Sequence, residues 1–116
     1  MKKIIFLLSL LMAFSASAKD CEQEESMSAA RVCSLNESEL PVELAYKKLV
    51  KSSKNKDSIS AIKKAQSDWR KYRDSSCQYV STIANDGGYQ EDAVLICQIE
   101  FNEARVKILT NYANKL

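Results

Sequence analysis

Four cysteines are the residues whose chemistry this sequence defines most directly. Cys21, Cys33, Cys77 and Cys97 stand far apart, and the chain contains no histidine. Zinc sites and thiol–disulfide oxidoreductases use closely spaced ligands, commonly a C-x-x-C pair, so neither chemistry is expected here. An even number of cysteines in a small exported chain instead favours two disulfides.

The other residues offer little support for catalysis. Without histidine, a serine or cysteine nucleophile lacks its usual base. Two carboxylates such as Asp68 and Asp74 could form a glycosidase pair, but they lie in a helix rich in charge, where a solvated face is the better interpretation. Gly87-Gly88 lacks the other elements of a phosphate-binding loop. We therefore expect no enzyme activity, no catalytic residue, no metal and no cofactor.

The first 18 residues have the composition of a secretory signal peptide. Lys2 and Lys3 precede an apolar run from Ile4 to Phe14, and Ala16-Ser17-Ala18 fits the cleavage pattern. The run is too short to span a membrane, which takes about 20 apolar residues. We expect one domain at residues 19–116, periplasmic or secreted, with no stable membrane anchor. Cleavage removes Lys2 and Lys3 and brings the formal net charge from +2 to zero, so no nucleic-acid partner is expected.

The periodicity of apolar residues predicts an all-α fold, a small disulfide-stapled bundle of about three to four helices. Strand-like alternation is almost absent. We expect a short helix at residues 26–33 and a second helix that has Pro41 in its first turn and ends after residue 51. A central helix should run from residue 57 or 58 to 84, and a last helix should span residues 90–112. Asn85-Asp86-Gly87-Gly88 should end the central helix and make a long antiparallel hairpin with the last one.

The central helix carries one apolar stripe with spacings of three and four residues. The stripe consists of Ile62, Ala65, Trp69, Tyr72, Ser76, Tyr79 and Ile83. We expect Trp69 and Tyr72 to fill the core, the alternative being a recognition patch of aromatic and arginine side chains with Arg73 and Asp74.

The last helix has an inner face of its own. Its members are Val94, Cys97, Phe101, Ala104 and Ile108, widened by Leu95, Ile96, Ile99 and Leu109. Arg105 lies beside this face and is predicted to pair with an acidic group, with Asp74 as the candidate.

The hairpin geometry predicts the disulfides. Cys77 and Cys97 are nearly equidistant from Gly87-Gly88, so they should lie level with each other in an antiparallel pair of helices. Such a bond should stabilise the fold by about 3 kcal/mol. By elimination Cys21 pairs with Cys33. In one continuous helix these two would stand about 18 Å apart, so this pairing requires the segment from Cys21 to fold back.

One motif is similar to that of a known family. It reads Gln66-x-x-Trp69-x-x-Tyr72-Arg73-Asp74-x-x-Cys77 and is followed by Gly87-Gly88, Cys97 and Arg105. The chain thereby resembles the LprI-type lysozyme inhibitor family. Cys21, Cys33 and the segment from Leu40 to Leu49 extend the resemblance over most of the mature chain. It implies a small helical domain of the bacterial cell envelope that inhibits a host or rival lysozyme by binding. The shared motif residues look like scaffold.

A charged segment offers a candidate contact for such a partner, because host lysozymes are strongly basic. The candidate partner-binding residues are Asp20, Glu22, Glu24, Glu25, Glu37, Glu39 and Glu43. They could steer association electrostatically, although acidic residues are equally common as ordinary helix caps. The alternative function is an envelope interaction or immunity protein whose partner is a bacterial toxin or envelope protein.

Overall fold

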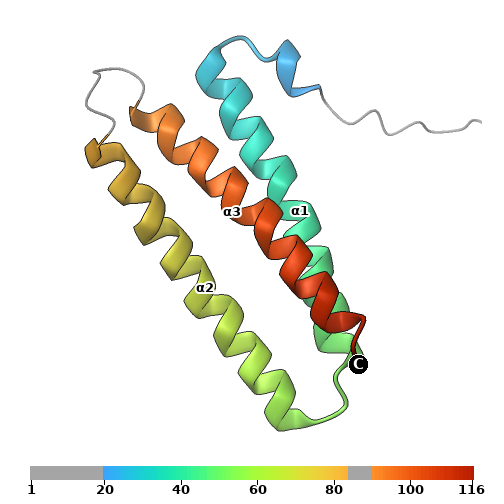
Figure 1. Ribbon diagram of the computed structural model, residues 1–116. Coiled ribbons are helices and arrows are strands. Elements are labelled where there is room, and N and C mark those ends of the chain that lie inside the picture. Colours follow the sequence, from blue (N-terminus) through green and yellow to red (C-terminus); the bar gives the residue numbers. More distant parts are fainter. Residues whose placement is uncertain (1–19, 84–89) are drawn as a thin grey trace, which may run out of the picture.

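The computed structural model describes residues 20–83 and 90–116, which form an all-α fold (Figure 1). A short 3-10 helix, η1 (Cys21–Gln23), precedes three α-helices: α1 (Met27–Ser52), α2 (Lys56–Ile83) and α3 (Gln90–Ala113). The predicted fold class, a helical bundle stapled by disulfides, is confirmed. The predicted signal peptide and Gly87-Gly88 lie outside the described residues.

Side-chain caps set where the first two α-helices begin. The Ser26 hydroxyl accepts a hydrogen bond of 3.0 Å from the amide of Ala29 at the start of α1. Before α2, the side-chain oxygen of Asn55 accepts one of 2.7 Å from the amide of Asp57. Each satisfies an amide that the first turn of a helix leaves without a partner. The predicted start of the central helix is thus correct to within two residues.

The predicted break before Pro41 is wrong, because α1 runs through this residue without interruption. A proline inside a helix removes one backbone hydrogen bond and costs about 3 kcal/mol. Contacts on both sides of Pro41 offset that cost: Ser38 is bonded to α3 and Val42 is fully buried. The proline ring itself is exposed.

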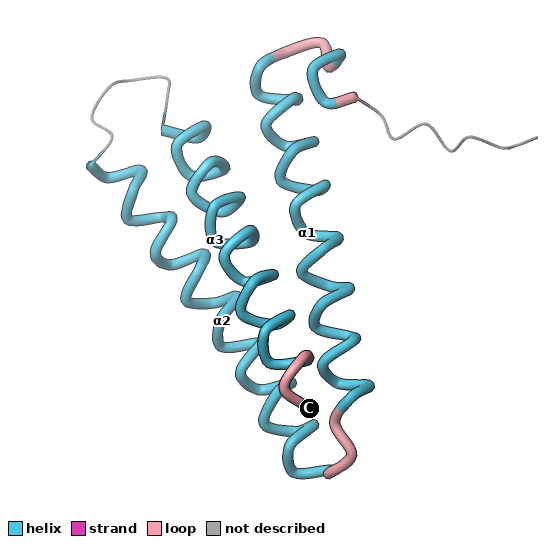
Figure 2. The backbone as a smooth tube through the Cα atoms, turned by 45° about the vertical axis from the view of Figure 1, so that its right-hand side comes forward, coloured by secondary structure: helices cyan, strands magenta, loops and turns pink. Residues whose placement is uncertain are grey.

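The three α-helices run alternately up and down, so α1 and α3 are parallel and α2 is antiparallel to both (Figures 1 and 2). α3 packs against both other helices, whereas α1 and α2 touch at few points. The apolar core contains Val42 and Leu49 of α1 and Leu109 of α3, with Ile62 and Trp69 of α2 packed against them. The core therefore lies in the half of the bundle near the α1–α2 connection.

The apolar stripe predicted for α2 is only partly buried. Tyr72 and Tyr79 are each 64% exposed, whereas Gln66, Arg73 and Cys77 face inward. Cys77 explains the difference, because its disulfide fixes which side of α2 faces α3. Residues four and eleven positions before Cys77 share its side of the helix, and these are Arg73 and Gln66. The expectation that Tyr72 fills the core is therefore wrong.

A similar rotation applies to α3. Ala104 and Ile108 of the predicted inner face are exposed, and Ile96 is exposed as well. Leu109 is buried as predicted, whereas the buried Asn102 was not predicted. Both α2 and α3 thus have buried polar side chains where they pack together.

Both predicted disulfides are confirmed. Cys77 and Cys97 join α2 to α3 with their Cα atoms 5.5 Å apart. Cys21 and Cys33 are also 5.5 Å apart, because η1 folds back on the first turns of α1 instead of extending them. Cys33 and Cys97 lie in the first third of α1 and of α3, so both bonds are toward the end of the bundle where these two helices begin.

Candidate functional site

A buried arginine connects the middle of the three α-helices. Arg73 of α2 is 7% exposed. Its Nε donates to Asp74 at 2.8 Å, and its Nη1 donates to Glu39 of α1 and, at 2.8 Å, to Asn102 of α3. Burial opposes the charge, but hydrogen bonds to Asp74 and Glu39 outweigh it and raise the pKa of Arg73. The guanidinium is therefore a permanent cation that ties α2 to both neighbours.

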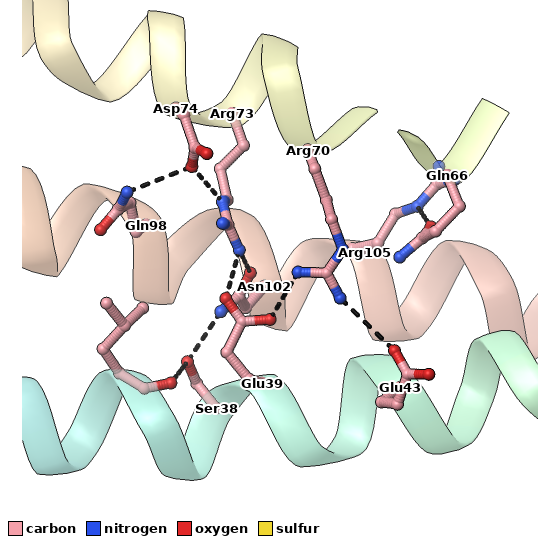
Figure 3. Close-up of polar contacts among 11 residues, drawn as sticks. Ser38, Glu39, Glu43, Gln66, Arg70, Arg73, Asp74, Gln98, Asn102 and Arg105 are labelled. Carbon is pink, nitrogen blue, oxygen red and sulfur yellow. Dashed lines mark hydrogen bonds and ion pairs between the residues drawn. The ribbon is translucent and has the colours of Figure 1, made fainter. Parts of the chain in front are cut away.

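The contacts of Asn102 extend this network to the backbone of α1 (Figure 3). Asn102 is fully buried, accepts from Arg73 and donates its amide to the Ser38 hydroxyl at 2.9 Å. Ser38 in turn donates to the backbone carbonyl of Leu35 at 2.7 Å. Buried polar groups are costly unless satisfied, and this chain of bonds satisfies them only when the helices are in one register.

A second arginine pairs with the same carboxylate from the outer side. Arg70 donates to Glu39 at 2.9 Å and to Glu43 at 3.5 Å, and its side chain is 36% exposed. Burial of Glu39 opposes its ionisation, but the hydrogen bonds from Arg70 and Arg73 hold the pKa of Glu39 below its ordinary value. α1 and α2, which share few other contacts, are joined here by charge.

Two guanidinium groups lie over the ring of Trp69. The Cζ atoms of Arg73 and Arg105 lie 5.3 and 5.2 Å from the centre of its ring. Trp69 is half-buried and packs against the apolar core. The expected scaffold role of Trp69 therefore fits its position, and the ring also holds two cations.

The predicted pairing of Arg105 with an acidic group is wrong. Its Nε donates to the side-chain oxygen of Gln66 at 3.0 Å. No carboxylate among the described residues lies within ion-pair distance of Arg105. Asp74, the expected partner, is bonded to Arg73 and Gln98. Burial lowers the pKa of Arg105, although a guanidinium stays charged at neutral pH.

The seven acidic residues predicted to meet a partner fall into two groups. Glu39 and Glu43 point toward α2 and are bonded to arginines. The other five lie at the start of the described chain and along the first turns of α1. This outer group consists of Asp20, Glu22, Glu24, Glu25 and Glu37. Glu24 is half-buried and the other four are exposed.

The outer acidic group lies beside exposed apolar side chains of α1. Leu40 and Leu44 are 65% and 68% exposed, and Val32 is exposed as well. Glu24, Val32, Glu37 and Leu40 line a common hollow. We call the surface formed by Glu24, Val32, Glu37, Leu40 and Leu44 the acidic-apolar face of α1.

One cluster of the described residues has side chains of the kinds that bind metals: Cys21, Cys33 and Glu37, whose ligand atoms lie within 4.8 Å of one another. Both cysteines are in a disulfide, so neither offers a thiolate. A thiolate is the form in which cysteine binds a metal. The cluster therefore places a carboxylate beside a disulfide and does not make a metal centre in the oxidised protein.

Several residues of the network were not predicted, namely Ser38, Arg70, Gln98 and Asn102. A signal for Asn102 exists in the sequence, because Leu95, Asn102 and Leu109 are spaced by seven residues and share one face of α3. A single amide at such a position commonly specifies the register of packed helices. Ser38 carries no comparable signal.

The comparisons with known proteins give one match. A family model described as lysozyme inhibitor LprI matches residues 15–109. No curated protein and no solved structure matches the chain significantly. The matched range includes all four cysteines, the residues of the buried network and the acidic-apolar face of α1.

Proposed function

This chain belongs to the LprI family of lysozyme inhibitors, and we propose that it inhibits by binding its target, without chemistry of its own. The family supports the lysozyme-inhibitor role. Binding as the mode of action rests on the use of the cysteines in disulfides and on the engagement of the buried charges with one another. The inhibitor would occupy or cover the cleft of the enzyme and exclude its substrate sterically.

The acidic-apolar face of α1 is the proposed contact surface, and its composition is the observation that carries the assignment. Protein interfaces combine an apolar centre with a polar rim. Here exposed Leu40 and Leu44 supply the apolar part and Glu37 the charge. The only basic residue between Asp20 and Glu43 is Arg31, so a basic lysozyme would be attracted to this end of the molecule.

The disulfide Cys21–Cys33 fixes the acidic residues of the N-terminal segment next to this surface. It holds η1 against α1, so Asp20, Glu22 and Glu25 are carried on a braced segment. A surface that is ordered before binding loses less conformational entropy when the complex forms. Both α1 and η1 therefore present their carboxylates in a fixed arrangement.

We also place the protein outside the cytoplasm. Disulfides persist in oxidising compartments, and lysozyme inhibition requires access to the cell envelope. Export through a signal peptide at residues 1–18 remains part of the proposal. None of the helices in the described part of the chain combines the length and apolar character that a membrane crossing demands.

The test is an inhibition titration with oxidised protein and a lysozyme that acts on bacterial cell walls. We expect inhibition to saturate near equal amounts of the two proteins. Glu37→Lys should weaken inhibition about tenfold through lost attraction. Glu100→Lys is the matched control, because Glu100 is exposed on α3 and this substitution changes the net charge by the same amount.

A double variant separates the contribution of apolar contact from that of charge. The double variant Leu40→Ala, Leu44→Ala should weaken binding while leaving the fold intact, since both side chains are exposed. Full inhibition by this variant and by Glu37→Lys would place the contact elsewhere. Failure of the wild-type protein to inhibit any of several lysozyme types would favour the alternative partner, a bacterial toxin or envelope protein.

A further inference from the structure

An apolar groove of about 340 Å³ lies at the end of the bundle opposite η1. The end of α1, the first turns of α2 and the last turns of α3 form its walls. Its side chains include Leu49, Ile62, Ile108, Leu109 and Tyr112, with Arg105 and Lys115 as the charged members. Its volume is near the lower end of the range for small-molecule sites, so it suits one narrow apolar chain.

The charged side chains that line the groove are of one sign. Arg105 and Lys115 are cationic, and no aspartate or glutamate side chain lines the groove. Within residues 20–83 and 90–116, Arg105 has Gln66 and the Trp69 ring as partners but no carboxylate. A half-buried guanidinium without a counter-ion is an electrostatic cost that a ligand anion would remove.

Gln66 supplies a second unused donor next to this cation. Its side-chain oxygen accepts from Arg105, which fixes the orientation of the amide and leaves Nε2 as a donor. Gln66 is 5% exposed, and its Nε2 has no hydrogen-bond partner. Burying such a donor without a partner is unfavourable, but Gln66 does not line the groove, so the groove's own unpaired donor is Arg105.

The surroundings would draw anions toward the groove. Lys47, Lys48, Lys51, Lys54, Lys56, Lys63 and Lys64 flank or follow the α1–α2 connection, and Asp57 is the only acidic residue between Lys47 and Lys64. Clustered charge of one sign raises the local concentration of oppositely charged ligands. The attraction of anions, the apolar lining and the guanidinium of Arg105 without a counter-ion therefore point to the same kind of ligand.

We propose that this groove binds a medium-chain aliphatic carboxylate, whose chain lies along Ile62, Ile108 and Leu109 and whose carboxylate pairs with Arg105. Lys115 lies at the same groove and adds a second positive charge. This inference goes beyond lysozyme inhibition and does not depend on it, because no residue of the acidic-apolar face of α1 lines the groove.

Trp69 provides the measurement. It is the only tryptophan, and Arg105 is stacked on it at 5.2 Å. Titration of the intact oxidised protein with decanoate, below its micelle concentration, should change the Trp69 emission saturably with one site per chain. Decyltrimethylammonium and decanol are the matched ligands, with the same chain but a positive or a neutral head. Calorimetry on the same samples should give the same affinity.

Two variants locate the ligand. Arg105→Gln should weaken decanoate binding at least about tenfold, since a hydrogen bond to a charged group contributes about 1.5–3 kcal/mol. Ile108→Asp places a negative charge on the groove wall and should weaken it by a similar factor. Ile108 is 45% exposed, so this variant should fold. Ile96→Asp is the matched control, because Ile96 is on the same helix, 37% exposed and outside the groove.

Three results would overturn the proposal. They are the absence of saturable decanoate binding, equal binding of decyltrimethylammonium, and unchanged affinity in folded Ile108→Asp. Binding of an apolar peptide with a free carboxylate, without binding of decanoate, would also reject the aliphatic ligand and show that the groove takes a protein segment. None of these outcomes bears on whether the protein inhibits lysozyme.

Discussion

Arg73 joins the three α-helices, so its removal should cost far more than the removal of its exposed neighbour. Arg73→Met leaves Glu39 with one partner fewer and the buried Asn102 oxygen without a donor. We expect the free energy of unfolding to fall by about 3–5 kcal/mol, measured by chemical denaturation. Arg70→Met is the control and should cost about 0–1 kcal/mol, because Arg70 is half-exposed. Equal losses would show that the network is not centred on Arg73.

Glu39 should make stability depend on pH. The pKa of Glu39 is lower in the folded protein than in the unfolded chain, so its ionised form stabilises the fold. This contribution is complete above the unfolded pKa, about 4.3, and is lost as the pH falls through the folded value. Denaturation measured between pH 6 and pH 2 should show that acidification lowers the free energy of unfolding less in Glu39→Gln than in Glu100→Gln. An identical pH profile for both variants would contradict the assignment.

Residue types alone predicted too simple an interior. The apolar stripe of α2 drew attention to Tyr72 and Tyr79, which are mostly exposed, although the Tyr72 ring packs edge-on against Phe101 of α3 at 5.8 Å. The side chains of α2 that are buried at this contact are Gln66, Arg73 and Cys77. The position of Cys77 was available as an anchor for the face of the helix, because it had to reach Cys97. The partners of Arg105 were not predictable, since they depend on which side chains of another helix arrive within hydrogen-bond distance.

At the scale of elements, Pro41 marks a site where α1 is less stable than it could be. Pro41 is exposed inside the helix, and alanine there would restore the backbone donor to the carbonyl of Glu37. We expect Pro41→Ala to raise the free energy of unfolding, by up to about 3 kcal/mol. Pro41→Gly should gain about 1 kcal/mol less. A loss of stability in Pro41→Ala would mean that α1 requires the proline geometry.

The α2–α3 hairpin should depend strongly on its disulfide. Exchange of both Cys77 and Cys97 for serine removes a cross-link that spans 20 residues and should lower the free energy of unfolding by about 3 kcal/mol. The double variant should lose no more than either single variant, because one bond is broken in each case. Additive losses in thermal or chemical denaturation would contradict this.

Elements were more predictable than their exact limits. The polar connection and the periodicity located α2 and α3 closely, although the cap of α2 was expected at Asp57 or Ser58 and is Asn55 in the structure. α1 was divided in the prediction because local rules disfavour an internal proline. The contacts with α3 that carry the helix through Pro41 are tertiary, and no local pattern reports them.

For the whole molecule, charge is separated along the bundle, although the mature chain is expected to be neutral. Asp20, Glu22, Glu24 and Glu25 lie around η1 at one end, and the lysine-rich α1–α2 connection lies at the other. We expect the association rate with a basic lysozyme to fall at least about tenfold when salt is raised from 0.1 to 1 M, because the Debye length shrinks from about 10 to 3 Å. The dissociation rate should change little. Surface plasmon resonance separates the two rates, and a salt effect confined to dissociation would exclude steering.

The class of fold followed from the sequence, but its packing order did not. Cysteine spacing and helical periodicity predicted a stapled hairpin of the central and last helices. That α1 would pack chiefly on α3, its parallel neighbour, depends on long-range burial of Val42, Leu49 and Leu109. A long helix with apolar residues on several sides does not show which helix it will meet.

The position of the two disulfides implies unequal local stability. Both cross-links lie toward the end where α1 and α3 begin, while the end with the groove is held by the α1–α2 connection and by side-chain contacts, without a disulfide. Backbone amides near Leu49 and Leu109 should therefore exchange with solvent through openings that break no covalent bond, and a reductant should alter their exchange less than it alters that of amides near Cys77. The disulfides would then stabilise the part of the molecule that is proposed to contact a protein, whereas the part that is proposed to bind a small ligand would open locally more often.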